Sequence, residues 1–387
     1  MSKEKNYFKL LPVILFVGII FFIAVKGVVS EKSLYSGTEN RVLQKMPKLN
    51  KKRVLNGKFQ KKYEIYLSDH IPGRDSWIKV QSLAERCIGR NESNGVFFGK
   101  DDYLLEHHTE NEFDKKQVNK NIKALTKFVE KNKKNADINI MIVPSKTYTM
   151  KGYLPKFAQT YDENIFYEKL NKSLSDIGED KILLDVRETL EKAMEEEQIY
   201  YRTDHHWTTA GAWYAYKFYC DYTGKESCIK KEDLSGSLTT VSEDFLGTTF
   251  SKVNTYSKKD KLQVFEPEHD VEVVYNLGEK TEDTYYNKEF LEKQDKYSVF
   301  FGGNQAVLEI TGGVKNSETL LVVKDSFANC MLPFLAENYE KVIVVDLRQL
   351  NAGVDMLVRG YQPSEVLVLY NTIQFMQSKD IASKFLR

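Results

Sequence analysis

Hydrophobic positions follow three patterns along this chain, and each pattern predicts a different kind of element. The first is an uncharged apolar run from Leu10 to Val25, which resumes after Lys26 as residues 27–29. About 20 apolar residues, at a rise of about 1.5 Å each, cross the hydrocarbon core of a bilayer. The run therefore predicts a transmembrane anchor at 10–29, with Lys26 reaching toward the headgroups.

The charges that flank this run predict its orientation. Lys3, Lys5 and Lys9 precede it, and the positive-inside rule leaves such an N-terminus in the cytoplasm. Residues 1–9 would be a cytoplasmic tail, and the chain after residue 30 would be extracytoplasmic. A cleaved signal peptide is the alternative, but the run is long for one and lacks a clear small-x-small cleavage site. Both interpretations place the body of the protein outside.

The second pattern is helical periodicity at 58–90, with a turn at Ile71-Pro72-Gly73. Residues 30–57 are polar and basic and are interpreted as a stalk, so that the folded domain is expected over 58–387.

The third pattern is an alternation of short apolar runs and amphipathic stretches, which predicts an α/β fold with a parallel sheet. The expected strands are 138–143, 182–185, 320–324, 342–346 and 366–370, and the expected helices are 114–135, 162–176, 187–197, 327–338 and 349–359. Residues 225–300 interrupt the alternation. They are rich in Tyr, Thr and Lys, and we interpret them as a β-rich insertion or cap.

Composition narrows the function classes. Basic and acidic residues balance at 56 to 55, so no bulk charge favours a nucleic-acid partner. No glycine-rich nucleotide loop is visible, so no organic cofactor is expected. The 23 Tyr and 22 Phe suit a large core, and they would also suit a carbohydrate groove. Cys220 and Cys228 are close enough to form a disulfide, with free thiols as the alternative.

A serine lies where an apolar strand meets an expected helix, in Lys324-Asp325-Ser326-Phe327. A sharp turn at such a junction lifts a nucleophilic hydroxyl above the sheet edge. The N–H groups of the following helix would suit an oxyanion. The alternative is that Asp325 or Ser326 only caps the helix.

Two of the six histidines lie in Asp204-His205-His206-Trp207. In an extended segment, residues two apart face the same side, so Asp204 would lie beside His206 and His205 would face away. A carboxylate next to a histidine is what a serine nucleophile requires. Asp204, His205 and His206 are also metal-ligand types, but no complementary ligand cluster is evident, so no metal is expected.

The string Asp204-His205-His206-Trp207 resembles the signature of the DHHW protein family, which is similar to the alginate O-acetyltransferase group of SGNH hydrolase-like proteins. Other segments that resemble the family are Glu39-Asn40-Arg41, Asp69-His70 with Arg74, Asn94-Gly95-Val96 with Gly99, Leu246-Gly247-Thr248 and Lys324-Asp325-Ser326-Phe327.

The resemblance implies a flavodoxin-like, three-layer α/β/α SGNH core. It also implies a catalytic triad of Asp204, His206 and Ser326, in an order permuted from the usual SGNH order. Enzymes of this kind pass acyl groups to sugar hydroxyls, often with a multispanning membrane acyltransferase as the acyl donor. The sequence departs from the SGNH pattern in having Lys324 where the Gly-Asp-Ser block has glycine. It also has no clear Gly-x-Asn-Asp block. The oxyanion or substrate-binding candidates are Asn371, Arg348, Asn329 and Gly303.

Two functions follow. The first is a serine acyltransferase or esterase acting on an envelope or exported polysaccharide; acceptance of the acyl group by a sugar gives transfer, and acceptance by water gives hydrolysis. The second is a non-catalytic polysaccharide-binding or scaffold protein. The Asp, His and Ser set favours the enzyme, because a binding module has no need of a triad.

Overall fold

The computed structural model describes residues 4–30, 32–36, 41–225 and 229–385, and its contacts divide the chain into two compact units. One unit comprises Met1–Arg90 with Ser251–Thr255, and the other comprises Asn91–Phe250 with Tyr256–Arg387. The domain boundaries expected from the sequence stay a prediction.

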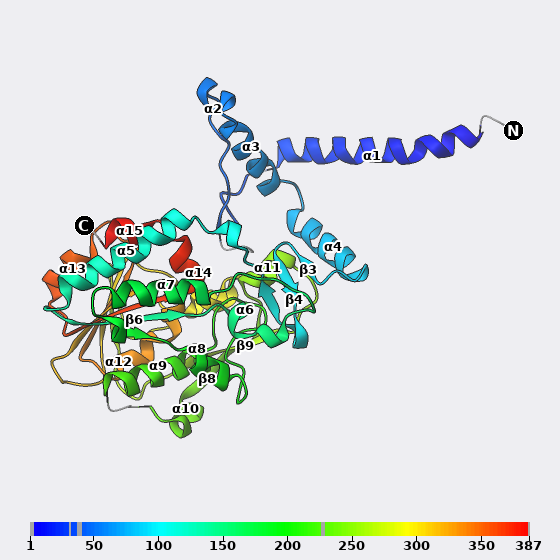
Figure 1. Ribbon diagram of the computed structural model, residues 1–387. Coiled ribbons are helices and arrows are strands. Elements are labelled where there is room, and N and C mark those ends of the chain that lie inside the picture. The colour runs from blue at the N-terminus through cyan, green and yellow to red at the C-terminus, as the bar shows by residue number, and fades with distance from the viewer. Residues whose placement is uncertain (1–3, 31, 37–40, 226–228, 386–387) are drawn as a thin grey trace. The chain divides into compact units, whose positions relative to one another are not determined.

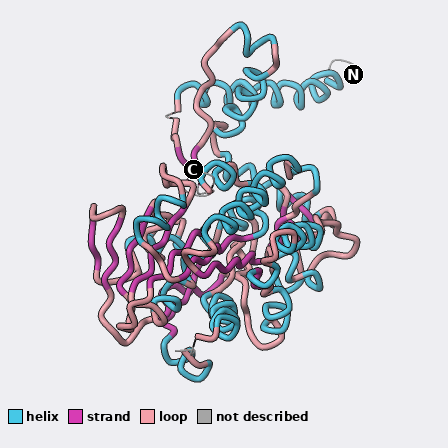
Figure 2. The backbone as a smooth tube through the Cα atoms, turned by 60° about the vertical axis from the view of Figure 1, so that its left-hand side comes forward, coloured by secondary structure: helices cyan, strands magenta, loops and turns pink. Residues whose placement is uncertain are grey.

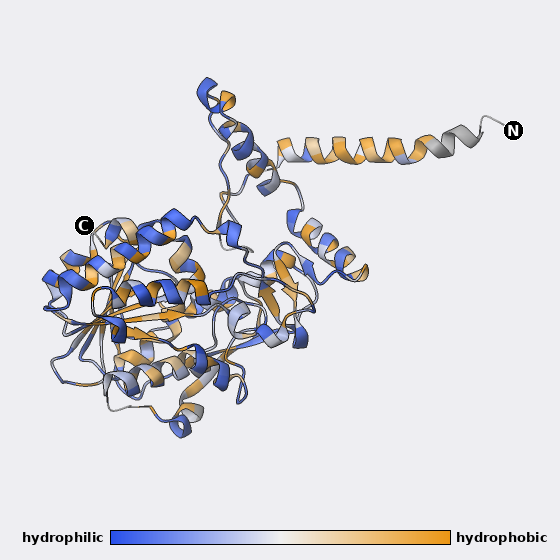
Figure 3. Ribbon diagram, viewed as in Figure 1, coloured by the Kyte–Doolittle hydropathy of each residue, from blue (hydrophilic) through white to orange (hydrophobic). Residues whose placement is uncertain are grey.

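The first unit begins with a single long apolar helix, α1 (Glu4–Val29), which Figure 3 shows as hydrophobic along most of its length. Its Leu10–Val29 segment is long and apolar enough to cross a membrane, and a signal sequence meets the same description. The other elements of the unit are β1 (Tyr35–Ser36), β2 (Arg41–Val42), α2 (Lys51–Leu55), α3 (Lys58–Asp69) and α4 (Arg74–Cys87). The expected break in the helical pattern is confirmed, because Gly73 adopts φ +71 immediately before α4.

The second unit is built on an eight-stranded sheet (Figures 1 and 2). In spatial order its strands are β11 (Lys280–Glu282), β10 (Glu272–Tyr275), β12 (Val307–Thr311), β14 (Lys341–Asp346), β13 (Thr319–Lys324), β15 (Glu365–Asn371), β6 (Asp137–Val143) and β7 (Leu183–Leu184). The last five of these strands pair in parallel. They match the strands that the apolar runs predict.

Side chains alternate between the two faces of this sheet, as the two-residue period of a strand requires. In β13, Leu320 and Val322 belong to one buried cluster, whereas Leu321 and Val323 belong to the other. One face is covered by α8 (Arg187–Ala193), α9 (Thr209–Thr223) and α12 (Leu332–Ala336), and the other by α5 (Lys115–Asn132), α7 (Asn164–Ser175), α13 (Val354–Tyr361), α14 (Thr372–Gln377) and α15 (Asp380–Lys384). The unit therefore has three layers, which Figure 1 shows above and below β6.

The sheet is mixed, and this corrects the expectation of a parallel sheet. Strands β10, β11 and β12 add to β14 in antiparallel pairs. Two of these strands lie within 225–300, so part of the expected insertion extends the sheet itself. Another part forms the separate hairpin of β8 (Leu238–Phe245) and β9 (Asp260–Phe265). Neighbouring antiparallel strands need no crossover helix, which is why the strand–helix alternation disappears there.

Shorter elements complete the unit. Residues 92–106 form a small antiparallel sheet, in which β4 (Val96–Phe98) pairs with both β3 (Glu92–Ser93) and β5 (Leu104–Glu106). The remaining helices are α6 (Lys146–Thr149), α10 (Lys231–Ser237), α11 (Thr248–Val253) and the 3₁₀ turns η1 (Lys100–Asp102), η2 (Glu110–Glu112), η3 (Lys151–Tyr153), η4 (Asp180–Ile182), η5 (Lys288–Glu292), η6 (Lys296–Val299) and η7 (Ser326–Cys330).

Candidate active site

Ser326 follows the carboxyl end of β13, as expected, and is half-buried. Asp325 holds this turn. One of its carboxylate oxygens accepts the Phe327 N–H at 2.9 Å, and the other accepts the Asn371 N–H at 2.8 Å. The carboxylate thus joins the end of β13 to the end of β15, which fixes the backbone on either side of the serine. Burial raises the pKa of Asp325.

The segment after the serine differs from the helix expected at 327–338. A 3₁₀ turn, η7, is followed by the five-residue helix α12, which carries a proline near its start. Helices this short leave little aligned dipole, so the expected helix N-terminus contributes little to holding an oxyanion.

Asp204 and His206 lie in a tight loop closed by an isolated bridge between Tyr200 and Trp207. Thr208 ends the loop, because its hydroxyl accepts the Gly211 N–H at 3.1 Å and caps α9. Within the loop, the carboxylate of Asp204 accepts both the backbone N–H of His206 at 2.9 Å and its ring Nδ1–H at 2.6 Å. Asp204, two residues earlier in the sequence, therefore orients the imidazole of His206.

The other ring nitrogen of His206 faces the serine. His206 Nε2 lies 2.8 Å from Ser326 Oγ, although the two residues are 120 positions apart. Asp204 and His206 are 1% and 4% exposed, so the pair is shielded from bulk water. The structure thus joins the three residues that the sequence singled out into one hydrogen-bonded chain, from carboxylate to imidazole to hydroxyl.

The second oxygen of Asp204 is held by Thr248. It accepts the Thr248 N–H at 2.7 Å and the Thr248 hydroxyl at 3.0 Å. Burial alone would raise the pKa of Asp204, but the nearby His205 and His206 hold that pKa below its ordinary value. The carboxylate therefore stays ionised and can stabilise an imidazolium.

Gly247 makes this arrangement possible, because a Cβ at that position would lie 2.2 Å from the Cβ and Oδ2 of Asp204. We expect Gly247→Ala to displace Asp204 and to reduce ester turnover by about 100-fold or more, since catalysis depends on sub-ångström positioning. Turnover of an acetyl ester, with the melting temperature measured alongside, checks this. Gly360→Ala is the matched control, since its Cβ meets nothing within 4 Å. Equal activity of the two variants would contradict the prediction.

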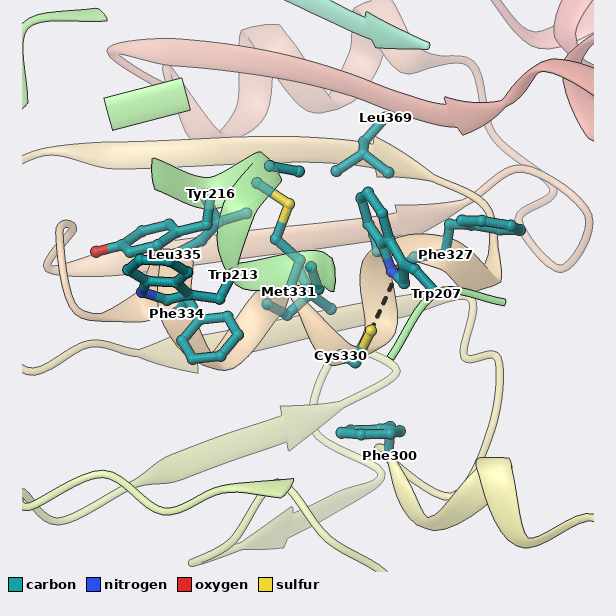
Figure 4. Packing of buried hydrophobic residues seen from close by; sticks show 14 of the residues in the cluster. Trp207, Trp213, Tyr216, Phe300, Phe327, Cys330, Met331, Phe334, Leu335 and Leu369 are labelled. Atoms are coloured by element: carbon teal, nitrogen blue, oxygen red, sulfur yellow. Dashed lines mark hydrogen bonds between the residues drawn. The ribbon is translucent and has the colours of Figure 1, made fainter. Parts of the chain in front are cut away.

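Aromatic side chains enclose the histidine. The ring of Tyr297 stacks on His206 at 3.9 Å and 8°, and its hydroxyl donates to the Ser326 carbonyl at 3.2 Å. Trp207 is fully buried, and its indole N–H donates to the Phe327 carbonyl at 2.8 Å. Figure 4 shows Trp207 among the packed side chains beside Phe327. Sequence reasoning missed Tyr297, because it is one of many tyrosines in the region interpreted as an insertion.

Lys146 stabilises the loop that carries Asp204 and His206, and sequence reasoning missed it as well. It is buried, and its ammonium donates to the backbone carbonyls of Tyr201, Arg202 and Asp204 at 3.1, 3.3 and 2.6 Å. A buried cation requires such partners. Lys146 is therefore a positioning group for the segment that carries Asp204 and His206. The only sequence signal is its place just after β6, at the edge where ligands bind in α/β sheets.

Lys324 departs from the glycine of the SGNH block and is fully buried. Its ammonium lies 3.6 Å from the Asp346 carboxylate and donates to Asn304 and Asn329 at 3.0 and 2.7 Å. Burial lowers the pKa of Lys324 to about 8, against the opposing effect of Asp346. The ammonium of Lys324 is thus held by Asp346, Asn304 and Asn329.

The four oxyanion candidates lie at this edge of the sheet, and Asn371 lines a small cavity with His205 and Phe327. The hydrogen bonds described for their donors and acceptors run to other groups: Asn371 to the Val143 and Pro144 carbonyls, Arg348 to both oxygens of Asp346, Asn329 to Lys324, and Gly303 to the Phe300 carbonyl. Their role in oxyanion binding stays a prediction.

His205 does not face away, which corrects the expectation from an extended segment. The residues 202–206 form bends, so the two-residue alternation does not apply. His205 Nδ1 lies 2.7 Å from the Thr248 hydroxyl and 3.5 Å from Asp204 Oδ1. Asp204, His205 and His206 bring ligand-type atoms within 4.8 Å of one another. The carboxylate oxygens are nevertheless engaged by N–H and O–H donors, and His206 Nε2 faces Ser326, which suits a triad.

The disulfide proposed for Cys220 and Cys228 stays a prediction, because Cys228 lies outside the described residues. Cys330 is buried near the site and contacts the hydroxyl of Tyr297 at 3.4 Å.

The chain is similar to one protein family and to several solved structures. Residues 163–345, which include Asp204, His206 and Ser326, match the family model described as "DHHW protein". No curated protein matches the sequence.

Solved structures cover about three quarters of this chain. A DHHW family protein from Eubacterium siraeum is 23% identical, with a TM-score of 0.61 over 76% of this chain and 96% of that chain. Bacillus cereus PatB1, solved with a sulfonyl adduct, is 21% identical, with a TM-score of 0.57 over 75% of this chain and 97% of that chain. The O-acetyltransferase domain of Pseudomonas putida AlgJ is 16% identical, with a TM-score of 0.46 over 75% and 95%. The first two similarities support the α/β fold.

Proposed function

We propose, from the premise that this chain belongs to the DHHW family, that it is a serine O-acyltransferase or esterase that uses Ser326, His206 and Asp204 on an acylated polysaccharide. The observation that carries the proposal is the continuous hydrogen-bonded chain of 2.6 Å and 2.8 Å from Asp204 through His206 to Ser326. A nucleophile, a base and a group that orients the base are what acyl transfer through an acyl-enzyme requires.

In the first half-reaction, His206 Nε2 accepts the proton of Ser326 as Oγ forms a bond to the acyl carbonyl carbon. The carbonyl oxygen takes the negative charge of the tetrahedral intermediate. Collapse breaks the bond to the donor oxygen, which leaves with the proton from His206. Asp204 accepts the Nδ1–H throughout and stabilises the imidazolium.

In the second half-reaction, a hydroxyl attacks the acyl-serine while His206 accepts its proton. Collapse returns that proton to Ser326 Oγ and releases the new ester or acid. A sugar hydroxyl gives transfer, and water gives hydrolysis. We propose acetyl as the acyl group and acetyl transfer to a sugar as the natural reaction.

For location, we propose that α1 anchors the protein, with residues 1–9 in the cytoplasm and the second unit outside. The three lysines before the apolar segment support this orientation. The acyl donor would then be supplied from the membrane, and a multispanning acyltransferase is the partner that suits this arrangement.

A sulfonyl fluoride tests the nucleophile independently of any natural substrate. We expect phenylmethylsulfonyl fluoride to modify the full-length, detergent-solubilised protein once, on the peptide that contains Ser326, and to abolish hydrolysis of p-nitrophenyl acetate. Peptide mass spectrometry locates the adduct. An unmodified Ser326 in a protein that still turns over the ester would contradict the proposal. A protein that is neither modified nor active would favour the non-catalytic polysaccharide-binding function.

A further inference from the structure

A groove of about 560 Å³ lies in the second unit, between two stretches of irregular chain. Residues 107–110 and 157–162 line it, together with Glu92, Phe97 and Ile165. None of these residues has a role in the proposed chemistry. A volume of about 560 Å³ exceeds what an acyl group alone requires, so the groove suits a larger ligand.

The groove and a small cavity near the triad share one lining side chain. His108 lines the groove, and it also lines the small cavity of about 30 Å³ that His205, Phe327 and Asn371 share. The position of His108 is fixed, because its Nδ1 lies 3.0 Å from Glu112 and its Nε2 lies 3.5 Å from Glu106. A chain lying in the groove would therefore contact a side chain that also lines the cavity beside His205 and Phe327.

Phe157 stands out in this groove. Its side chain is 86% exposed, and its backbone has φ +66, the left-handed region that bulky residues rarely adopt. The Lys156 ammonium lies 4.9 Å from the ring centroid at the rim. A strained backbone that presents a large apolar ring to solvent gains nothing in folding, and such strain marks ligand-binding positions. A flat exposed ring suits the C–H face of a sugar.

The charges in the groove restrict the ligand further. Glu92, Glu110 and Asp162 line it, and none of its described lining residues is a lysine or an arginine. Glu92 bonds His107 at 2.8 Å, and Glu110 bonds Lys115 at 2.6 Å. The lining therefore carries carboxylates beside hydrogen-bonding side chains. Lys115 offsets Glu110, and Glu92 and Asp162 remain without a lysine or arginine among the lining residues, so the groove favours the hydroxyl groups of an uncharged chain over a polyanion.

We propose that this groove binds the acceptor glycan, a chain without carboxylate or phosphate groups, with one sugar ring stacked on Phe157. The inference rests on the proposed function, because only acyl transfer makes the bound glycan an acceptor. Binding of the glycan itself does not depend on Ser326. It identifies the substrate class as a neutral or amino-sugar polymer and argues against a polyuronate.

Calorimetric titration of the full-length protein in detergent tests the groove. The probes are cellohexaose, chitohexaose and the chitosan hexamer, with a hexauronate of the same length. We expect at least one uncharged or amino-sugar hexamer to bind, and the hexauronate to bind roughly ten-fold or more weakly at low salt. We expect Phe157→Ala to weaken the bound hexamer by roughly five- to ten-fold. Tyr256→Ala, which removes an exposed ring that does not line the groove, should leave the affinity unchanged.

The outcomes separate this inference from the proposed function. Three results would each overturn the inference that the groove binds this glycan. They are equal affinities in Phe157→Ala and Tyr256→Ala, a preference for the hexauronate, and no binding of any uncharged or amino-sugar hexamer. Sulfonylation of Ser326 and ester turnover by the wild type, measured on the same preparation, would leave the proposed chemistry standing in each of these cases. Glycan binding without sulfonylation or turnover would retain the groove and contradict the chemistry.

Discussion

Ser326→Ala is expected to lower the hydrolysis of p-nitrophenyl acetate by roughly 10³- to 10⁶-fold, to the level of the uncatalysed reaction plus what binding alone provides. The reason is geometric. The Ser326 hydroxyl lies 2.8 Å from His206 Nε2, and its removal leaves the base without the group that it deprotonates. The initial rate of p-nitrophenol release at fixed protein concentration measures the loss.

Folding of this variant should change little. The hydroxyl is half-buried and its described partner is His206, so its removal should change the free energy of unfolding by about 1 kcal/mol. Circular dichroism and the melting temperature check this. Ser242→Ala is the matched control, because this half-buried hydroxyl lies outside the triad. It donates to the Asp244 carboxylate at 2.8 Å and accepts from the Lys296 ammonium at 3.2 Å. A folded Ser326→Ala protein with wild-type turnover would show that another group is the nucleophile.

Asp204→Asn is the second large effect, and we expect it to lower turnover by about 10⁴-fold. The carboxylate accepts the His206 backbone and ring N–H groups at one oxygen and two Thr248 groups at the other. An amide offers an NH₂ group at one of these places, so a donor meets a donor whichever way it is turned. Either the wrong imidazole tautomer is favoured or the Thr248 N–H loses its partner. The kcat for acetyl ester hydrolysis measures the effect.

The pH dependence of this variant follows from the depressed pKa of Asp204. Its folded pKa lies below the unfolded value of about 3.9, so the carboxylate contributes stability above that value and loses this contribution as pH falls through the folded pKa. Between pH 5 and pH 9 the group stays ionised, so the deficit of Asp204→Asn should not vary with its titration there. Asp244→Asn, at an exposed pair with Lys296, is the matched control. A deficit of less than ten-fold would exclude Asp204 as the orienting group.

The fold was largely predictable because its core strands are continuous apolar runs bounded by polar turns. Ile138–Val143 and Leu320–Lys324 both become buried parallel strands within a residue of the expected bounds. The antiparallel edge was not predictable in the same way. Its strands β10 and β11 are short, partly exposed and embedded in Tyr- and Lys-rich sequence, so their apolar alternation spans only a few residues.

The site was predictable as far as local motifs carry it. Asp204 and His206 are two residues apart, and Ser326 follows a clear strand, so both parts could be identified before their contact was known. Tyr297 and Lys146 could not, because their roles arise from packing between distant segments. The prediction for His205 was wrong because residues 202–206, enclosed by the Tyr200–Trp207 bridge, form bends in place of the extended backbone that the spacing argument assumed.

The place of β15 in the sheet has a consequence for biosynthesis. This strand comes last of the eight in sequence, yet it lies between β13 and β6 and pairs with both. A nascent chain that has not yet reached residue 365 carries both halves of the sheet without the strand that joins them, and Asp325 lacks the Asn371 N–H that fixes its turn. The nucleophile and its base therefore come into register only after residues 365–371 have been synthesised. Products that end before β15 would be inert, because this strand both joins the two halves of the sheet and fixes the turn that carries Ser326.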